Sequence, residues 1–133
     1  MTTERAVTAP GPGTPASETR PCPFCGRIER GEFDHSDRAS VAFEPLNPVT
    51  PGHLLVVPRK HVSSVFADPA VAGDALEFAG YLANRLQIGA ANFITSAGKD
   101  ATQTVFHLHW HIVPRRPDDG LHLPWTGQKR DGQ

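Results

Sequence analysis

The chain of 133 residues is long enough for one domain with a hydrophobic core, and its 13 Lys and Arg nearly balance its 14 Asp and Glu, which leaves no basic excess for duplex nucleic acid. No apolar run approaches the roughly 20 residues of a membrane span, and the N-terminus lacks the apolar segment of a signal peptide. The cysteines, Cys22 and Cys25, are too few and too close for a secreted disulfide framework, so the composition favours a cytoplasmic protein.

Residues 1–20 are rich in Thr, Ala, Pro and Gly and show no apolar periodicity. We expect this stretch to be a disordered tail, although docking on a partner stays open. The folded domain is expected to span residues 21–116, followed by a C-terminal tail over residues 117–133.

Cys22 and Cys25 form a C-x-x-C motif, a spacing that lets two thiolates reach one tetrahedral zinc ion. A redox dithiol is the rival interpretation, but such a motif normally opens a helix after a strand, and no strand is predicted before it. Two unliganded thiols are the third interpretation. A zinc site needs two more ligands, and histidine, with seven copies, is the abundant candidate. A short helix is expected from Arg27, ending at Gly31.

Two strands are predicted in the first half of the chain. Residues 39–44 form the first, and residues 45–52 hold three prolines and a glycine, which predicts a fixed, extended loop. Residues 53–58 are mainly aliphatic and β-branched and predict a central strand. His53 stands at the entrance of this strand and His61 just after its exit. Either histidine alone is typical of a solvated surface, so both matter only if the fold brings them beside other histidines.

A long helix is predicted from Pro69 to about Leu86, because Asp68 is a good N-cap and Pro69 suits the first helical position. Apolar residues recur along it at helical spacing and predict core packing rather than a cofactor site. Residues 91–95 form another predicted strand, and a polar loop over residues 96–102 turns the chain back. This strand is expected to pair antiparallel with the one that follows.

Residues 104–114 carry the strongest pattern in the chain. Three histidines, His107, His109 and His111, alternate with large apolar residues, which is typical of a strand with one buried face. In such a strand the three imidazoles share one face, roughly 7 Å apart from step to step. We therefore expect them to be exposed together and aimed at a metal ion, a phosphate group, or both.

Residues 103–113 resemble the H-x-H-x-H-x-x signature of the histidine triad (HIT) family. Residues 51–61 resemble the upstream strand of that family, and Cys22-Pro23-Phe24-Cys25 resembles the zinc knuckle of many bacterial members. The resemblance covers about residues 22–114. It implies an α+β fold with an antiparallel sheet of about five strands and one long helix, to which the residue pattern adds a short N-terminal helix. It also implies a homodimer that binds nucleotides and acts at the α-phosphate of phosphoramidates or dinucleoside polyphosphates.

The same resemblance assigns catalytic roles. His109 matches the nucleophile, which would form a nucleotidyl-histidine intermediate, and a neutral imidazole near pH 7 suits that attack. His111 would contact the phosphate oxygens, and His53 would offset the charge of the transition state. Gln103 and Thr104 match the polar pair that contacts phosphate and leaving group.

The zinc-containing relatives imply a structural site of two cysteines and two histidines. In this chain the matching residues are Cys22, Cys25, His61 and His107. A closed set of four ligands leaves no position for a catalytic water.

Two departures from the family pattern concern substrate binding. Pro45 stands where many members have an aspartate that holds the ribose hydroxyls, so Glu44 and Asn47 are the candidates for that contact. Ser96 stands in place of a common asparagine near the phosphate, and Thr102 in place of a common glycine. These departures predict an unusual substrate preference with an intact nucleophile.

Two rival functions stay open at this point. A zinc-stabilised module could hold nucleotides or protein partners without turnover. The intact stretch from Gln103 to His111 speaks against this function, and the altered ribose position keeps it open. A metal enzyme could use the H-x-H pair directly, as in cupin-like sheets, although that hypothesis leaves the cysteines unused.

Overall fold

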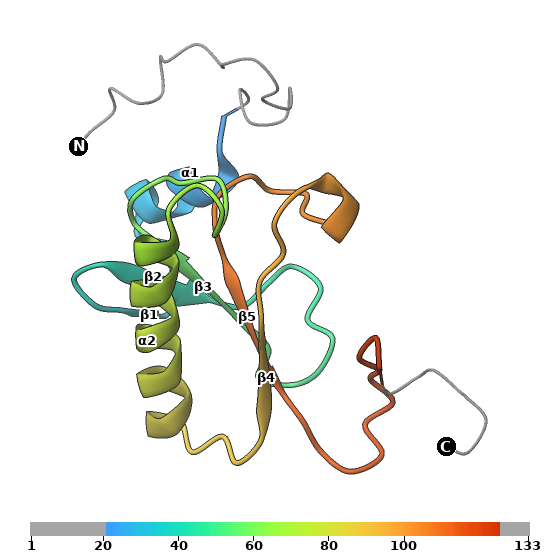
Figure 1. Cartoon of the computed structure of the whole chain (residues 1–133). Coiled ribbons are helices and arrows are strands. Elements are labelled where there is room, and N and C mark those ends of the chain that lie inside the picture. Colours follow the sequence, from blue (N-terminus) through green and yellow to red (C-terminus); the bar gives the residue numbers. More distant parts are fainter. Residues whose placement is uncertain (1–20, 126–133) are drawn as a thin grey trace.

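The computed structural model describes residues 21–125, and the predicted disorder of residues 1–20 lies outside this range. Five strands form an antiparallel sheet in the order β1-β2-β3-β5-β4. With the two helices this confirms the predicted α+β fold (Figure 1). The elements are α1 (Pro23–Arg30), β1 (His35–Ser36), β2 (Ser40–Phe43), β3 (Leu54–Pro58), α2 (Pro69–Arg85), β4 (Ala91–Ile94), the short 3-10 helix η3 (Lys99–Ala101) and β5 (Trp110–Pro114). The short edge strand β1 was not predicted from the sequence.

Helix α2 begins as the sequence predicts. The side chain of Asp68 accepts a hydrogen bond from the Val71 N–H at 3.1 Å, and Pro69 occupies the first turn. Its buried side packs on one face of the sheet and forms the larger hydrophobic core. Leu82 is fully buried there, and shortening it to Ala would cost about 2 to 5 kcal/mol. Among residues 21–125 no helix is long and apolar enough to span a membrane.

The opposite face of the sheet is covered in part by α1, whose Phe24 packs with Phe43 in a second apolar cluster. The helix starts four residues before its predicted beginning, with Cys22 as its N-cap. It ends as predicted at Gly31, which adopts a left-handed conformation (φ 70°). Cys25 therefore lies inside the helix, although the sequence predicted a helix only from Arg27 onward.

The predicted strand over residues 104–114 is wrong in its first half, since β5 begins only at Trp110. Before that point the backbone makes irregular bonds: the Leu108 N–H donates to the Val62 carbonyl at 2.7 Å, and the Thr95 hydroxyl donates to the His109 carbonyl at 2.7 Å. A common exposed face for the three histidines is also wrong, because His107 is completely buried. The irregular backbone turns each imidazole to a different neighbour.

Candidate active site and metal cluster

Four side chains from distant parts of the chain meet between α1, the end of β3 and the segment before β5. Their ligand atoms all lie within 4.8 Å of one another, and they are Cys22, Cys25, His61 and His107. The Cys22 sulfur lies 3.3 Å from His107 Nδ1, and the Cys25 sulfur lies 3.4 Å from His61 Nδ1. The two Nδ1 atoms are 3.1 Å apart. The structure thus brings together the four residues expected from the sequence to bind a metal.

The donor set and its spacing fit a tetrahedral cation. With bonds of about 2.3 Å to sulfur and about 2.0 Å to nitrogen, neighbouring ligand atoms of a tetrahedron lie about 3.3 to 3.8 Å apart. His107 is also prepared as a ligand, because its Nε2 donates to the Pro58 carbonyl at 2.7 Å and leaves the lone pair on Nδ1. A hydrogen bond with Cys25, followed by burial, raises the pKa of the Cys22 thiol, so a cation that binds here displaces a proton.

His109 is held through one ring nitrogen. Its Nδ1 lies 2.8 Å from the backbone carbonyl of His107, an acceptor that fixes the hydrogen on Nδ1. The lone pair of Nε2 is then available for nucleophilic attack. The ring of Phe24 packs edge-on against the His109 ring with centroids 5.1 Å apart, which limits its rotation.

His53 and His111 form a second, connected pair. The backbone N–H of Val49 donates to His53 Nδ1 at 3.1 Å, and His53 Nε2 lies 2.9 Å from His111 Nδ1. In the neutral rings this order places hydrogen on Nε2 of both histidines. His111 therefore presents an N–H donor through its remaining nitrogen, and its ring centroid lies 5.3 Å from that of His109.

Burial keeps these imidazoles neutral at pH 7. Desolvation is the main cause that lowers the pKa of His53 and of His109 below the ordinary value. For His111, burial followed by repulsion from its two histidine neighbours lowers the pKa to about 4. A neutral His109 can act as a nucleophile, while the neutral His111 stays a hydrogen-bond donor.

Gln103 is buried and its side-chain amide is engaged with the backbone. Its Oε1 accepts from the Gly98 N–H at 2.8 Å, and its Nε2 donates to the carbonyls of Ser63 and Val105 at 2.7 and 3.0 Å. In this conformation Gln103 fastens the loop before the histidines. Contact with phosphate through its amide, the role expected from the resemblance, requires one of these bonds to open.

The remaining predicted contacts lie on more open surface. Thr104, Glu44 and Asn47 are exposed, and Ser96 is half-buried. Of these, Glu44 has an electrostatic effect on the histidine pair, since its charge partly offsets the desolvation that lowers the pKa of His53.

Two residues at this site were not predicted from the sequence. Phe24 packs on His109 and Val49 sets the hydrogen position in His53. Phe24 lies between the two cysteines of the knuckle, so the expected closeness of that knuckle to the histidines was a usable signal. Val49 acts through its backbone, and no side-chain pattern marks such a role.

Comparison with known proteins identifies the family of this chain. A family model described as HIT domain matches residues 34–118. Adenosine 5'-monophosphoramidase HNT1 of Saccharomyces cerevisiae is 31% identical over 123 residues, covering 88% of this chain and 77% of that protein. A solved structure of a HIT family hydrolase from Clostridium thermocellum is 31% identical, with a TM-score of 0.64 over 73% of this chain and 92% of that chain. A HIT family protein from Bacillus anthracis is 32% identical, with a TM-score of 0.67 over 78% and 80% of the two chains. On sequence, fold and the match over most of its length, the chain belongs to the HIT family.

Proposed function

We propose that this protein hydrolyses, or transfers the nucleotidyl group of, nucleoside phosphate derivatives through a covalent intermediate on His109. The observation that carries the proposal is the 2.8 Å contact of His109 Nδ1 with the His107 carbonyl, which leaves Nε2 as the nucleophile. A HIT family hydrolase and an adenosine 5'-monophosphoramidase among the relatives support the reaction class.

In the first step the Nε2 lone pair of His109 attacks the α-phosphorus, and the bond from phosphorus to the leaving group breaks. The leaving amine or phosphate departs with the electron pair and takes up a proton. In the second step water attacks the same phosphorus and loses a proton, while the phosphorus–nitrogen electrons return to His109. His111 would donate its Nε2–H to a non-bridging oxygen as negative charge builds up.

The other contacts follow from the predicted site. We assign Gln103 and Thr104 to the phosphate and leaving group, and Ser96 to the edge of the phosphate site. Glu44 and Asn47 are assigned to the sugar hydroxyls because Pro45 has no side chain that can bind them. The name of the yeast relative favours phosphoramidates over dinucleoside polyphosphates as substrates.

We further propose that the four-residue cluster holds zinc. Two thiolates and two imidazoles are a donor set that zinc prefers, and their convergence supports a closed structural site. A zinc ion bound there would cross-link α1 to the histidine segment and would play a structural rather than a catalytic role. Thiols are kept reduced in the cytosol, so a site with two thiolate ligands agrees with the expected cytoplasmic location.

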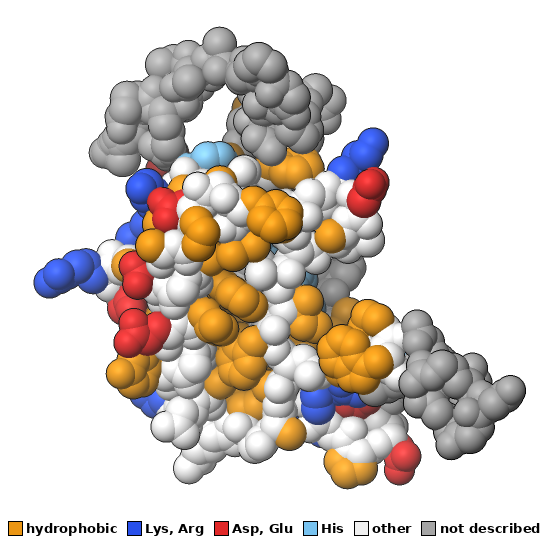
Figure 2. All heavy atoms as spheres, in the orientation of Figure 1, with side chains coloured by type: hydrophobic (Ala, Val, Ile, Leu, Met, Phe, Trp, Pro, Cys, Tyr) orange, Lys and Arg blue, Asp and Glu red, His pale blue; other side chains and the backbone are white. Residues whose placement is uncertain are grey.

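The position of β4 at the edge of the sheet formed by residues 21–125 supports the expected homodimer. β4 is the last strand in the sheet order, and Phe93 and Ile94 on it are exposed, as are Leu76 and Tyr81 on α2. Figure 2 shows apolar side chains gathered in a band between α2 and the β4 segment. Such an edge pairs readily with a second copy. Sedimentation of the full chain should give a dimer that Ile94→Lys weakens; a wild-type monomer at all concentrations contradicts this.

The test is a paired assay of an adenosine phosphoramidate and a diadenosine polyphosphate with wild type and His109→Ala. Wild type should cleave at least one substrate, and the variant should lose at least about 10³-fold in rate because the nucleophile is gone. Reactions quenched in alkaline denaturant should yield a nucleotidyl adduct on His109 by mass spectrometry. Nucleotide binding without turnover would leave the protein a binding module and reject the proposal.

A further inference from the structure

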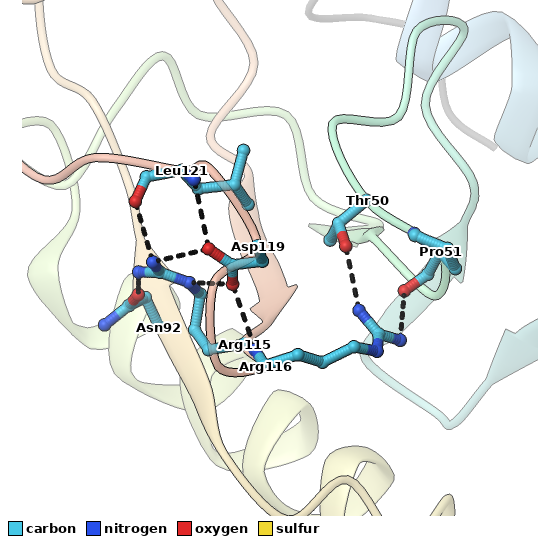
Figure 3. A network of polar contacts seen from close by, with 7 residues as sticks. All are labelled: Thr50, Pro51, Asn92, Arg115, Arg116, Asp119 and Leu121. Atoms are coloured by element: carbon cyan, nitrogen blue, oxygen red, sulfur yellow. Dashed lines mark hydrogen bonds and ion pairs between the residues drawn. The ribbon is translucent and has the colours of Figure 1, made fainter.

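Two consecutive arginines that follow β5 hold different parts of the molecule (Figure 3). Arg115 donates to both carboxylate oxygens of Asp119 at 2.8 and 3.1 Å, to Asn92 Oδ1 at 2.7 Å and to the Leu121 carbonyl at 2.8 Å. Asp119 also accepts the backbone N–H groups of Arg116 and Leu121. These bonds tie the turn after β5 to strand β4 and fix where the next side chain starts.

The side chain of Arg116 reaches in the other direction. Its Nη1 donates to the Thr50 hydroxyl at 2.8 Å and its Nη2 to the Pro51 carbonyl at 3.1 Å. Thr50 is buried, so the guanidinium holds an internal point of the loop before β3. A guanidinium suits this task because its donors form a planar fork, which fixes orientation as well as distance.

The loop segment held by Arg116 is a tight turn that ends in His53. The His53 N–H donates to the Thr50 carbonyl at 3.1 Å, with Pro51 and Gly52 at the two central positions. Gly52 has φ +87°, and a Cβ there would lie 3.3 Å from the Pro114 side chain. The turn is therefore pressed against the end of β5, and its fourth residue is the histidine that contacts His111.

We propose that Arg116 is a positioning residue for His53, and the inference rests on the proposed function. By fixing the Thr50–His53 turn it keeps the Val49 N–H on His53 Nδ1, which sets the hydrogen on Nε2. That hydrogen in turn determines that His111 offers its N–H donor to the substrate. The Arg116 side chain donates to Thr50 and Pro51 of the turn and acts on His53 through that turn.

The experiment compares Arg116→Ala with Arg59→Ala in the full chain. Arg59 is a matched control because it also donates to a turn carbonyl, that of Asp37 at 3.3 and 3.2 Å, but at the other end of β3. Arg116→Ala should lower kcat by about 10-fold to 100-fold with a smaller change in KM, since a displaced catalytic group costs that much. Arg59→Ala should leave kcat within about twofold.

The second readout is independent of activity. In ¹⁵N NMR spectra of the imidazoles, wild-type His53 should show a single Nε2–H tautomer, and Arg116→Ala should shift it toward a mixture. Arg116→Lys keeps the positive charge but lacks the planar guanidinium, so it should restore kcat and the His53 tautomer only in part. If Arg116→Ala does not fold, Thr50→Val, which removes one of the two acceptors, should produce the same changes to a smaller extent.

The outcomes separate this inference from the proposed function. If wild type turns over no nucleotide, the proposed function fails, and the tautomer of His53 alone decides the role of Arg116. A drop in kcat together with the tautomer change supports the inference. An unchanged tautomer in Arg116→Ala overturns it, whether or not stability or kcat falls.

Discussion

His107 and His109 lie two residues apart but are held in opposite ways. In His107 the backbone carbonyl of Pro58 binds Nε2 at 2.7 Å, so Nδ1 faces the cysteines. In His109 the carbonyl of His107 binds Nδ1 at 2.8 Å, so Nε2 keeps its lone pair for the proposed attack on the substrate. The difference shows that a carbonyl oxygen, rather than the residue type, decides which nitrogen each histidine offers.

The same comparison shows how the Cys/His cluster and His109, the proposed nucleophile, are connected. His107 gives its ring nitrogen to the cluster and its carbonyl to His109. Phe24, between the two cysteines, packs on the His109 ring. A change that moves His107 therefore also moves the carbonyl that holds His109. Replacing His109 removes none of the four cluster residues, so it should leave the cluster's ligands in place.

The largest expected effect follows from this asymmetry. His107→Ala should abolish metal binding and lower the free energy of unfolding by more than about 3 kcal/mol, because it removes a ligand and a buried side chain. His109→Ala should lose turnover but keep its metal. For both variants, mass spectrometry measures the metal content, and denaturant unfolding measures the free energy of unfolding. Equal metal content in the two variants would contradict the separation of roles.

Replacing Phe24 should affect the connection between the two regions. Phe24→Ala should destabilise the fold by about 3 kcal/mol, since the ring is 8% exposed and packs against Phe43 and His109. It should also lower kcat, because His109 gains freedom to rotate. Phe66→Ala is the matched control: that ring is 81% exposed, and its loss should change stability by less than about 0.5 kcal/mol. Unchanged kcat in a folded Phe24→Ala would show that the ring does not position His109.

A smaller effect concerns pH. The folded pKa of His111, about 4, lies below the ordinary value of about 6.5 that it regains on unfolding. The unfolded chain therefore binds more protons between these values, so the stability that is present above pH 6.5 is lost as the pH falls toward 4. Between pH 7.5 and 4.5 the Tm of His111→Asn should decrease less than the Tm of wild type, with both proteins at equal metal content. An equal decrease of Tm in the two proteins would show that a group other than His111 causes the acid sensitivity.

The sequence predicted the parts of the site that depend on side-chain type. Alternating apolar residues revealed a sheet segment at His111, and Asp68-Pro69 marked the start of α2. The resemblance brought Cys22 and Cys25 together with His61 and His107. The sequence could not give the carbonyl that holds His109 or the N–H of Val49, because backbone groups are the same at every position.

One error and one omission have the same physical origin. Alternation in residues 104–109 was interpreted as a strand, but the bonds from Leu108 to Val62 and from Thr95 to His109 replace the regular ladder. The sequence also suggested no role for Arg116, because its partners lie 66 and 65 residues earlier in the chain. Contacts over such separations leave no local pattern.

Cys22 and His107, which contact each other in the cluster, are separated by 85 positions in the sequence. During synthesis on a ribosome the cysteines emerge early, and the last ligand emerges only when nearly the whole domain has been made. A truncated chain that ends before His107 can offer at most three of the four ligands. Complete coordination in the proposed zinc site would thus require translation to pass His107, so the site would close only after almost all of the sheet has been made.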